Sequence, residues 1–531
     1  MSKMARGATT PFQRAHSPRR RVVFVGCGRP RPGLPASPAQ LPLSPFPRLD
    51  CGPGFDAGAM IMGGSTRTWL GRFLGILVVP ALVLGLLVGL APASLAAPVR
   101  GGTSPAPAGQ RLAALPASLR AALRQAFGVL VGAPAYSQQA RLSASGATPG
   151  NNFGYSVALS AAGGTAVVGA PFDNSGTGLA YVFSRQGAGW AQTAELSASD
   201  GAPGNGFGSS VAVSSLGNTV VVGAPGGGSS GGSAAYVFGE RGDGWAQTAE
   251  LTASDGAPGN GFGYSVAVSS GGNTVVVGAP YRDSGTGAAY VFSAPSWFSR
   301  PGTGWTQTAE LTAADGATFD DFGWSVSLSS FGTTALVGAP YRDAGTGAAY
   351  VFSAPSWFSR PGTGWAQTAE LTAAGGGVAL GNFGYSVSLS AFGGTALVGA
   401  PGPASGTGAA YVFGGRGSAW SPIAELTATD GAAGDNFGVS VSLSAFGSTA
   451  LVGAAYHGAF AGAAYVFDGR GPAWGQAAEL TATAEAPSGE FGWSVSLAAL
   501  GTTALVGAPF PNSVTGAAYL FGGPAWGPWT R

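Results

Sequence analysis

The stretch Phe153-Gly154-Tyr155-Ser156-Val157-Ala158-Leu159-Ser160 is followed at residues 169–171 by Gly-Ala-Pro. Seven times in this chain a Phe-Gly pair is followed, sixteen residues later, by the start of a Gly-Ala-Pro-like motif. The pairs begin at Phe153, Phe207, Phe262, Phe322, Phe383, Phe437 and Phe491. The second motifs begin at Gly169, Gly223, Gly278, Gly338, Gly399, Gly453 and Gly507. A constant inner spacing within a repeat of 54 to 61 residues indicates one structural unit repeated seven times.

Each repeat reads as four short strands. In the first repeat, residues 155–160 alternate with a period of two, and residues 165–168 form a short apolar run that ends before Pro171. Residues 180–183 and 190–196 supply a third and a fourth strand. No helical segment separates them, so the pattern predicts an all-β fold, a seven-bladed β-propeller of four-stranded antiparallel blades.

The last repeat has only three strands before the chain ends. Residues 136–142 align with the fourth strand of the first repeat, residues 190–196, at an offset of 54. We therefore expect this N-terminal segment to supply the outermost strand of the seventh blade and to close the ring. Residues 526–529, Trp-Gly-Pro-Trp, compete for the same place in this interpretation.

The repeated residues resemble FG-GAP repeats, the units of the integrin α-subunit head, and more closely the secreted FG-GAP propellers of bacteria. The resemblance covers about residues 135–531, and every repeat adds Tyr-Val-Phe or Tyr-Leu-Phe to the two motifs. It implies non-enzymatic binding or adhesion to extracellular protein or glycan partners. The calcium loop that many integrin repeats carry between the first two strands is absent, because the short turns at 161–164, 216–218 and 331–333 hold no acidic residue.

The chain divides into four parts. Residues 1–61 are rich in Arg and Pro and are a disordered tail or a mis-assigned extension, with translation starting at Met60 or Met62. Residues 62–97 read as an export signal, with an apolar stretch at 73–91 and Ser-Leu-Ala before the expected cleavage point. An uncleaved membrane anchor is the alternative, since the stretch nearly spans a bilayer. Residues 98–134 are a linker with a short amphipathic helix, and residues 135–531 are the propeller, secreted or on the cell surface.

Composition excludes several functions. From residue 98 onward there are 14 Arg, no Lys and 21 Asp and Glu, a net charge of −7, which disfavours nucleic acid. Cys27 and Cys51 both precede this part, so it has no thiol chemistry. His457 is its only histidine, and we interpret it as a loop residue of a degenerate repeat. We therefore expect no enzyme. The rival functions are an exported hydrolase or lyase with a site at the channel, and a structural envelope component.

Acidic residues recur in the loops before Phe-Gly. Asp315, Asp320 and Asp321 are the best candidates for a Ca²⁺ site, because this ion takes six to eight oxygen ligands. Turn formation explains the same residues, since Asp-Gly and Asn-Gly sequences favour turns.

The third and fourth repeats carry an identical insertion between their third and fourth strands, at residues 293–304 and 353–364. Each insertion adds a Trp-Phe pair to its hairpin, and we expect the two hairpins to be neighbours. The candidate binding residues are Trp297, Phe298, Trp357, Phe358, Arg282 and Arg342. Trp and Arg are enriched among binding hot spots. The alternatives are a recent internal duplication with packing onto the outer strands, and ion pairs of the two arginines with Asp283 and Asp343. A membrane becomes a partner only if residues 73–91 stay uncleaved.

Overall fold

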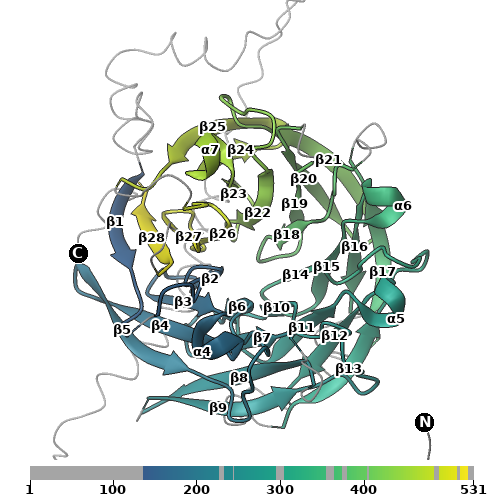
Figure 1. Ribbon diagram of the computed structural model, residues 1–531. Coiled ribbons are helices and arrows are strands. Elements are labelled where there is room, and N and C mark those ends of the chain that lie inside the picture. Colours follow the sequence, from purple (N-terminus) through teal and green to yellow (C-terminus); the bar gives the residue numbers. More distant parts are fainter. Residues whose placement is uncertain are drawn as a thin grey trace, which may run out of the picture. The chain divides into compact units, whose positions relative to one another are not determined.

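The computed structural model describes residues 136–146, 148–226, 232–242, 244–294, 304–354, 364–373, 380–402, 406–483, 489–510 and 515–523. These residues form seven four-stranded antiparallel sheets arranged in a ring, which confirms the predicted seven-bladed β-propeller (Figure 1). The expected export signal, linker helix and residues 526–529 lie outside the described residues. Among the residues described, no helix is long and apolar enough to cross a membrane.

The first strand of each blade lies nearest the axis, and the second follows outward. The first strands, in blades 1 to 7, are β2 (Ser156–Leu159), β6 (Ser210–Val213), β10 (Ser265–Val268), β14 (Ser325–Leu328), β18 (Ser386–Leu389), β22 (Phe437–Leu443) and β26 (Ser494–Leu497). The second strands are β3 (Thr165–Ala170), β7 (Thr219–Ala224), β11 (Thr274–Ala279), β15 (Thr334–Ala339), β19 (Thr395–Ala400), β23 (Thr449–Ala454) and β27 (Thr503–Ala508).

The third and fourth strands form the outer part of each blade. The third strands are β4 (Leu179–Gln186), β8 (Ala234–Arg241), β12 (Ala288–Ser293), β16 (Ala348–Ser353), β20 (Ala409–Arg416), β24 (Ala463–Arg470) and β28 (Ala517–Gly522). The fourth strands of blades 1 to 6 are β5 (Gly189–Leu196), β9 (Gly244–Leu251), β13 (Thr306–Leu311), β17 (Ala366–Leu371), β21 (Ala419–Leu426) and β25 (Ala473–Leu480).

The N-terminal strand closes the ring. β1 (Ser137–Leu142) pairs antiparallel with β28 and becomes the fourth strand of blade 7, as expected from the alignment of residues 136–142. Leu142 is buried in the cluster between blades 7 and 1. The ring is therefore held together by strand pairing between the two ends of the described chain.

The hydrophobic core lies between blades rather than within them. Phe153 is fully buried and packs against Tyr181 and Phe183 of its own blade, in a cluster that also holds Leu505 and Leu520 of blade 7. Six further clusters of the same kind join the other neighbouring blades. Full burial of one Phe side chain contributes about 1.5–3 kcal/mol, so the phenylalanine of each Phe-Gly pair anchors its blade to the preceding one.

The glycines of the two motifs form the seam between blades. The Gly208 amide donates to the Gly223 carbonyl of its own blade at 3.0 Å, and its carbonyl accepts from Ser156 Oγ of blade 1 at 2.7 Å. Gly208 needs a φ of +95°, which favours glycine. The serine bond recurs at all seven seams, ending with Ser494 to Gly154. The spacing of sixteen residues from the Phe of the first motif to the Gly of the second places Gly208 opposite Gly223 within the blade.

The loops after Gly-Ala-Pro and the loops before Phe-Gly meet at one end of the propeller, which we call the GAP-loop face. The Gly206 amide, for example, donates to the Gly176 carbonyl of the preceding blade at 2.8 Å. Within the part of the chain that the structure describes, four loops on this face contain a single helical turn: α4 (Asp173–Gly176), α5 (Arg282–Gly285), α6 (Arg342–Gly345) and α7 (His457–Phe460). Each turn includes two residues with left-handed φ and ψ values.

Candidate binding site

A hollow of about 710 Å³ opens on the GAP-loop face between the loops of blades 4 and 5. Its lining residues are Phe319, Asp321, Tyr341, Ala344, Gly345, Leu380 and Asn382. The Asn382 amide donates a hydrogen bond of 2.8 Å to the Gly345 carbonyl, and this bond joins the two blades at the hollow. The loops that form the hollow are therefore fastened to each other and to a rigid ring.

Two large apolar side chains at this hollow are exposed and belong to residues whose backbone has a left-handed conformation, which non-glycine residues disfavour. Phe319 and Leu380 are 72% and 57% exposed and have φ values of 70° and 64°. Blades 1, 2, 3 and 6 have glycine at the same position, three residues before Phe-Gly, namely Gly150, Gly204, Gly259 and Gly434. A left-handed non-glycine residue costs roughly 1–2 kcal/mol, and clustered backbone strain is typical of functional sites. Packing does not explain these two side chains.

An arc of aromatic rings runs from the hollow across the residues that directly precede the first strands of neighbouring blades. The residue after Phe-Gly is aromatic in several blades, and the rings of Tyr264, Trp324 and Tyr385 follow one another with centroids 4.6 and 5.3 Å apart. Trp324 also lies 5.4 Å from Tyr341, which lines the hollow. Burial raises the pKa of Tyr264 and of Tyr385, so both phenols stay neutral. The arc thus extends the hollow with an uncharged aromatic surface.

The three predicted calcium ligands take three different positions. Asp315 pairs with Arg342 at 2.6 Å, whereas Asp320 is buried and accepts a hydrogen bond of 2.8 Å from the Ala317 amide within its own turn. Asp321 lines the hollow, and burial, followed by the charge of Asp320, raises its pKa to about 6. Two of the carboxylates are therefore engaged elsewhere, and a Ca²⁺ site of all three stays a prediction.

The two predicted arginines lie inside their own blades. Arg282 pairs with Asp283 at 3.3 Å, and it also pairs with Asp255 at 2.9 Å and Glu310 at 2.7 Å.

Arg342 repeats the arrangement in blade 4. It pairs with Asp343 at 3.0 Å, with Asp315 at 2.6 Å and with Glu370 at 2.9 Å. The expected ion pairs with Asp283 and Asp343 are thus present, and each belongs to a larger junction. A binding role for Arg282 and Arg342 stays a prediction, as does that of Trp297, Phe298, Trp357 and Phe358, which lie outside the described residues.

The opposite end of the propeller also carries exposed apolar side chains. They stand at the turns between the first and second strands, and Phe331, Phe392 and Phe446 follow one another at 6.1 and 6.4 Å between ring centroids. In these turns the left-handed residue is the neighbouring glycine, such as Gly332. No strained backbone displays these rings, so the hollow is the better candidate site.

Sequence reasoning missed Phe319 and Leu380. The signal was present, because the fourth and fifth repeats have Phe and Leu where four other repeats have Gly. It also left His457 as an ordinary loop residue, although the structure places it against Asp430 and Asp435, at 3.8 and 2.8 Å.

The comparisons with known proteins agree with this geometry. The FG-GAP repeat family matches seven segments, residues 136–183, 190–238, 245–292, 305–352, 365–413, 420–467 and 474–521. Each segment begins within one residue of the start of a fourth strand and ends within the third strand of the next blade. No curated protein matches the chain. With seven matched repeats over more than half of its length, the chain belongs to the FG-GAP repeat family.

Proposed function

We propose that this propeller is a non-enzymatic binding module that acts outside the cell and receives a protein partner at the hollow between blades 4 and 5. An FG-GAP propeller fits a binding or adhesion module, and the family is typically non-enzymatic. The proposed export rests on residues 62–97, which read as a signal sequence.

The observation that carries the proposal is the display of Phe319 and Leu380. Both are exposed, both hold a left-handed backbone, and both stand where four other repeats have glycine. Large apolar groups beside a preformed cavity act as anchors in protein interfaces, because they bury area without further ordering of the backbone. The seams between blades hold the loops in place before a partner arrives.

A protein partner fits the hollow better than a glycan. Sugars are held mainly by several polar groups, and among the described lining residues Asp321, whose raised pKa leaves it partly protonated near pH 6, is the one carboxylate; Phe319 and Leu380 instead offer large apolar area. An apolar or aromatic side chain of a partner would bury Phe319 and Leu380 and leave Tyr341 and the aromatic arc at the edge of the contact.

The test compares the purified chain with the double variant Phe319→Gly/Leu380→Gly on arrays of extracellular proteins and glycans. Glycine is the residue that other blades have at these positions, so the variant should fold with equal or higher stability. Phe392→Ala, on the opposite end of the propeller, is the matched control. We expect a protein ligand whose binding weakens at least about tenfold in the double variant and is unchanged in the control. A silent array, a glycan ligand, or equal binding by all three proteins would contradict the proposal.

A further inference from the structure

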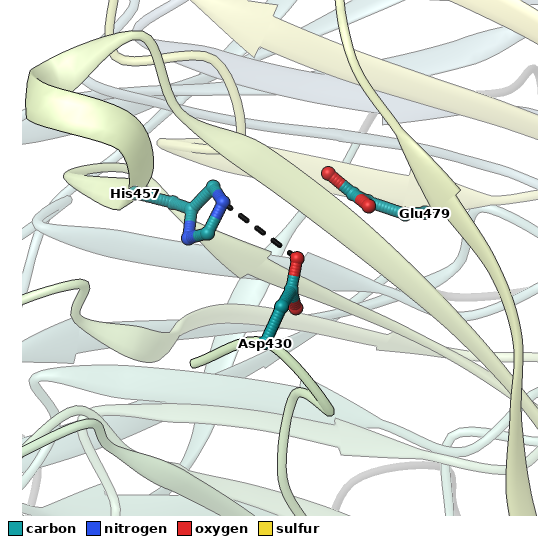
Figure 2. A group of neighbouring side chains, drawn as sticks. All are labelled: Asp430, His457 and Glu479. Carbon is teal, nitrogen blue, oxygen red and sulfur yellow. Dashed lines mark ion pairs between the residues drawn. The ribbon is translucent and has the colours of Figure 1, made fainter. Parts of the chain in front are cut away.

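Blades 3, 4 and 6 share a junction of two carboxylates and one basic residue. The first carboxylate comes from the loop before Phe-Gly and the second from the fourth strand. In blade 3, Arg282 lies between Asp255 and Glu310, at 2.9 and 2.7 Å. In blade 6, Asp430 and Glu479 occupy the corresponding places, and His457 stands where the arginine would be (Figure 2). The permanent guanidinium charge is thus missing from the blade 6 junction.

The imidazole of His457 is oriented for ligation. Nδ1 lies 2.8 Å from Asp435 Oδ2, an oxygen that also accepts the Ala432 amide at 2.7 Å. A carboxylate oxygen accepts hydrogen bonds, so the Nδ1–H group of the ring donates to Asp435, and Nε2 is the nitrogen that the neutral ring would offer to a metal ion. Nε2 lies 3.8 Å from Asp430 Oδ2. The Asp435 side chain is only 8% exposed, so it holds the ring firmly.

The three side chains converge on one point. One ligand atom each from Asp430, His457 and Glu479 lies within 4.8 Å of the other two. Figure 2 shows the ring and the two carboxylates directed toward one another, with Asp430 and His457 joined by the drawn ion pair. Bonds of about 2.0–2.2 Å to one ion require ligand atoms roughly 3–3.5 Å apart, which small side-chain rotations reach from here.

A fully buried tyrosine of the third strand adjoins each of these junctions. In blade 3, the Tyr290 hydroxyl donates to Asp255 at 3.1 Å. The equivalent hydroxyls of Tyr350 in blade 4 and Tyr465 in blade 6 make no hydrogen bond, although Arg342 fills the blade 4 junction. The tyrosine therefore does not distinguish blade 6, and the difference between the junctions is His457 itself.

We infer that blade 6 binds one divalent transition metal ion, of the Zn²⁺ type, through His457 Nε2, Asp430 and Glu479. An imidazole with two carboxylates suits Zn²⁺ or Co²⁺, whereas Ca²⁺ takes six to eight oxygens. Asp435 orients the ring from behind. Because Asp430 and Glu479 are exposed on the GAP-loop side, a fourth position stays open to water or to a group of a partner. The ion would occupy the charge position that arginine fills in blades 3 and 4.

The test measures binding of Zn²⁺ and of Co²⁺ to the whole chain by calorimetry and by the visible absorption of Co²⁺. The variants are Asp430→Asn, Glu479→Gln and His457→Gln, which keep side-chain size, and Asp435→Asn, which removes only the support of the ring. Asp255→Asn, at the matching place in blade 3, is the control. His16, Cys27 and Cys51 are present in every protein tested, so any binding they contribute cancels in the comparison.

We expect the wild-type chain to bind one Zn²⁺ that the three ligand variants lose, with the dissociation constant rising at least about 100-fold. Asp435→Asn should weaken binding by about 10- to 100-fold, the usual effect of losing an orienting group. Asp255→Asn should bind as the wild type does. Equal Zn²⁺ and Co²⁺ binding by wild type and His457→Gln, or no binding that depends on Asp430 and Glu479, would overturn the inference. Either result would leave His457 as a hydrogen-bonded member of a purely structural junction.

Discussion

Replacing Gly169 with alanine should force blades 1 and 2 apart. An added Cβ would lie 2.0 Å from the Gly208 carbonyl oxygen and 2.4 Å from Ser156 Oγ. The first of these is backbone of the neighbouring blade and cannot rotate away. Ordinary contact needs about 3.5 Å, so the seam would have to open by roughly 1.5 Å. This movement breaks the 2.7 Å bond between Ser156 and Gly208.

The cost follows from these two effects. Overpacking of a tight interior costs about 1–3 kcal/mol, and a lost hydrogen bond about 1 kcal/mol, so we expect about 2–4 kcal/mol of destabilisation. Gly164→Ala, five residues earlier, is the control. A Cβ there meets nothing within 4 Å and the backbone is not left-handed, so its effect should stay within about 0.5 kcal/mol.

Chemical denaturation followed by the fluorescence of the 13 tryptophans measures both variants. The comparison uses the shift in midpoint at an unchanged slope, because a changed slope would indicate that the blades no longer unfold together. If Gly169→Ala and Gly164→Ala differ by less than about 0.5 kcal/mol, the motif glycines are not the seam that holds neighbouring blades.

Two further predictions concern the ring and the hollow. Ser494→Ala removes the 2.8 Å bond to Gly154 at the closing seam and should cost about 1 kcal/mol in the same denaturation experiment; an unchanged midpoint would show that this bond is energetically silent. In the folded protein the pKa of the Asp321 carboxyl is raised from 3.8 to about 6, so the folded state binds this proton more tightly than the unfolded state does. The contribution of Asp321 to the free energy of unfolding should therefore decline as the pH rises from about 4 to about 6 and then level off. Asp321→Asn should remove this decline in melting temperature, and an identical pH profile in the variant would contradict the placement of Asp321.

Much of the propeller fold could be predicted from a single repeat. Phe153 and Gly169 mark the anchor and the seam, and the constant spacing between them predicts a repeated blade without any other information. The alignment of residues 136–142 with a fourth strand predicted the closing strand correctly, because a strand that completes a repeated sheet keeps the repeat's residues. Export and the aromatic insertions at 293–304 and 353–364 stay predictions.

The candidate sites were harder to read. Asp315, Asp320 and Asp321 are close in sequence, yet one pairs with Arg342, one closes its own turn and one lines the hollow. Neighbours in a loop point in different directions because each residue's φ and ψ differ, and left-handed φ values such as that of Asp321 change direction sharply. Sequence proximity therefore did not mean a shared ligand.

The blade and the number of blades could be predicted from the sequence, because both depend on local patterns that recur at fixed spacing. The seams between blades and the contacts between loops became visible only in the folded ring. Phe319 and Leu380 come together because two neighbouring blades present equivalent loops at one end of the ring. Asp430, His457 and Glu479 converge although 49 residues separate the first from the last. The antiparallel sheet returns the chain to the same end of the blade, and no local pattern records which side chains it then brings into contact.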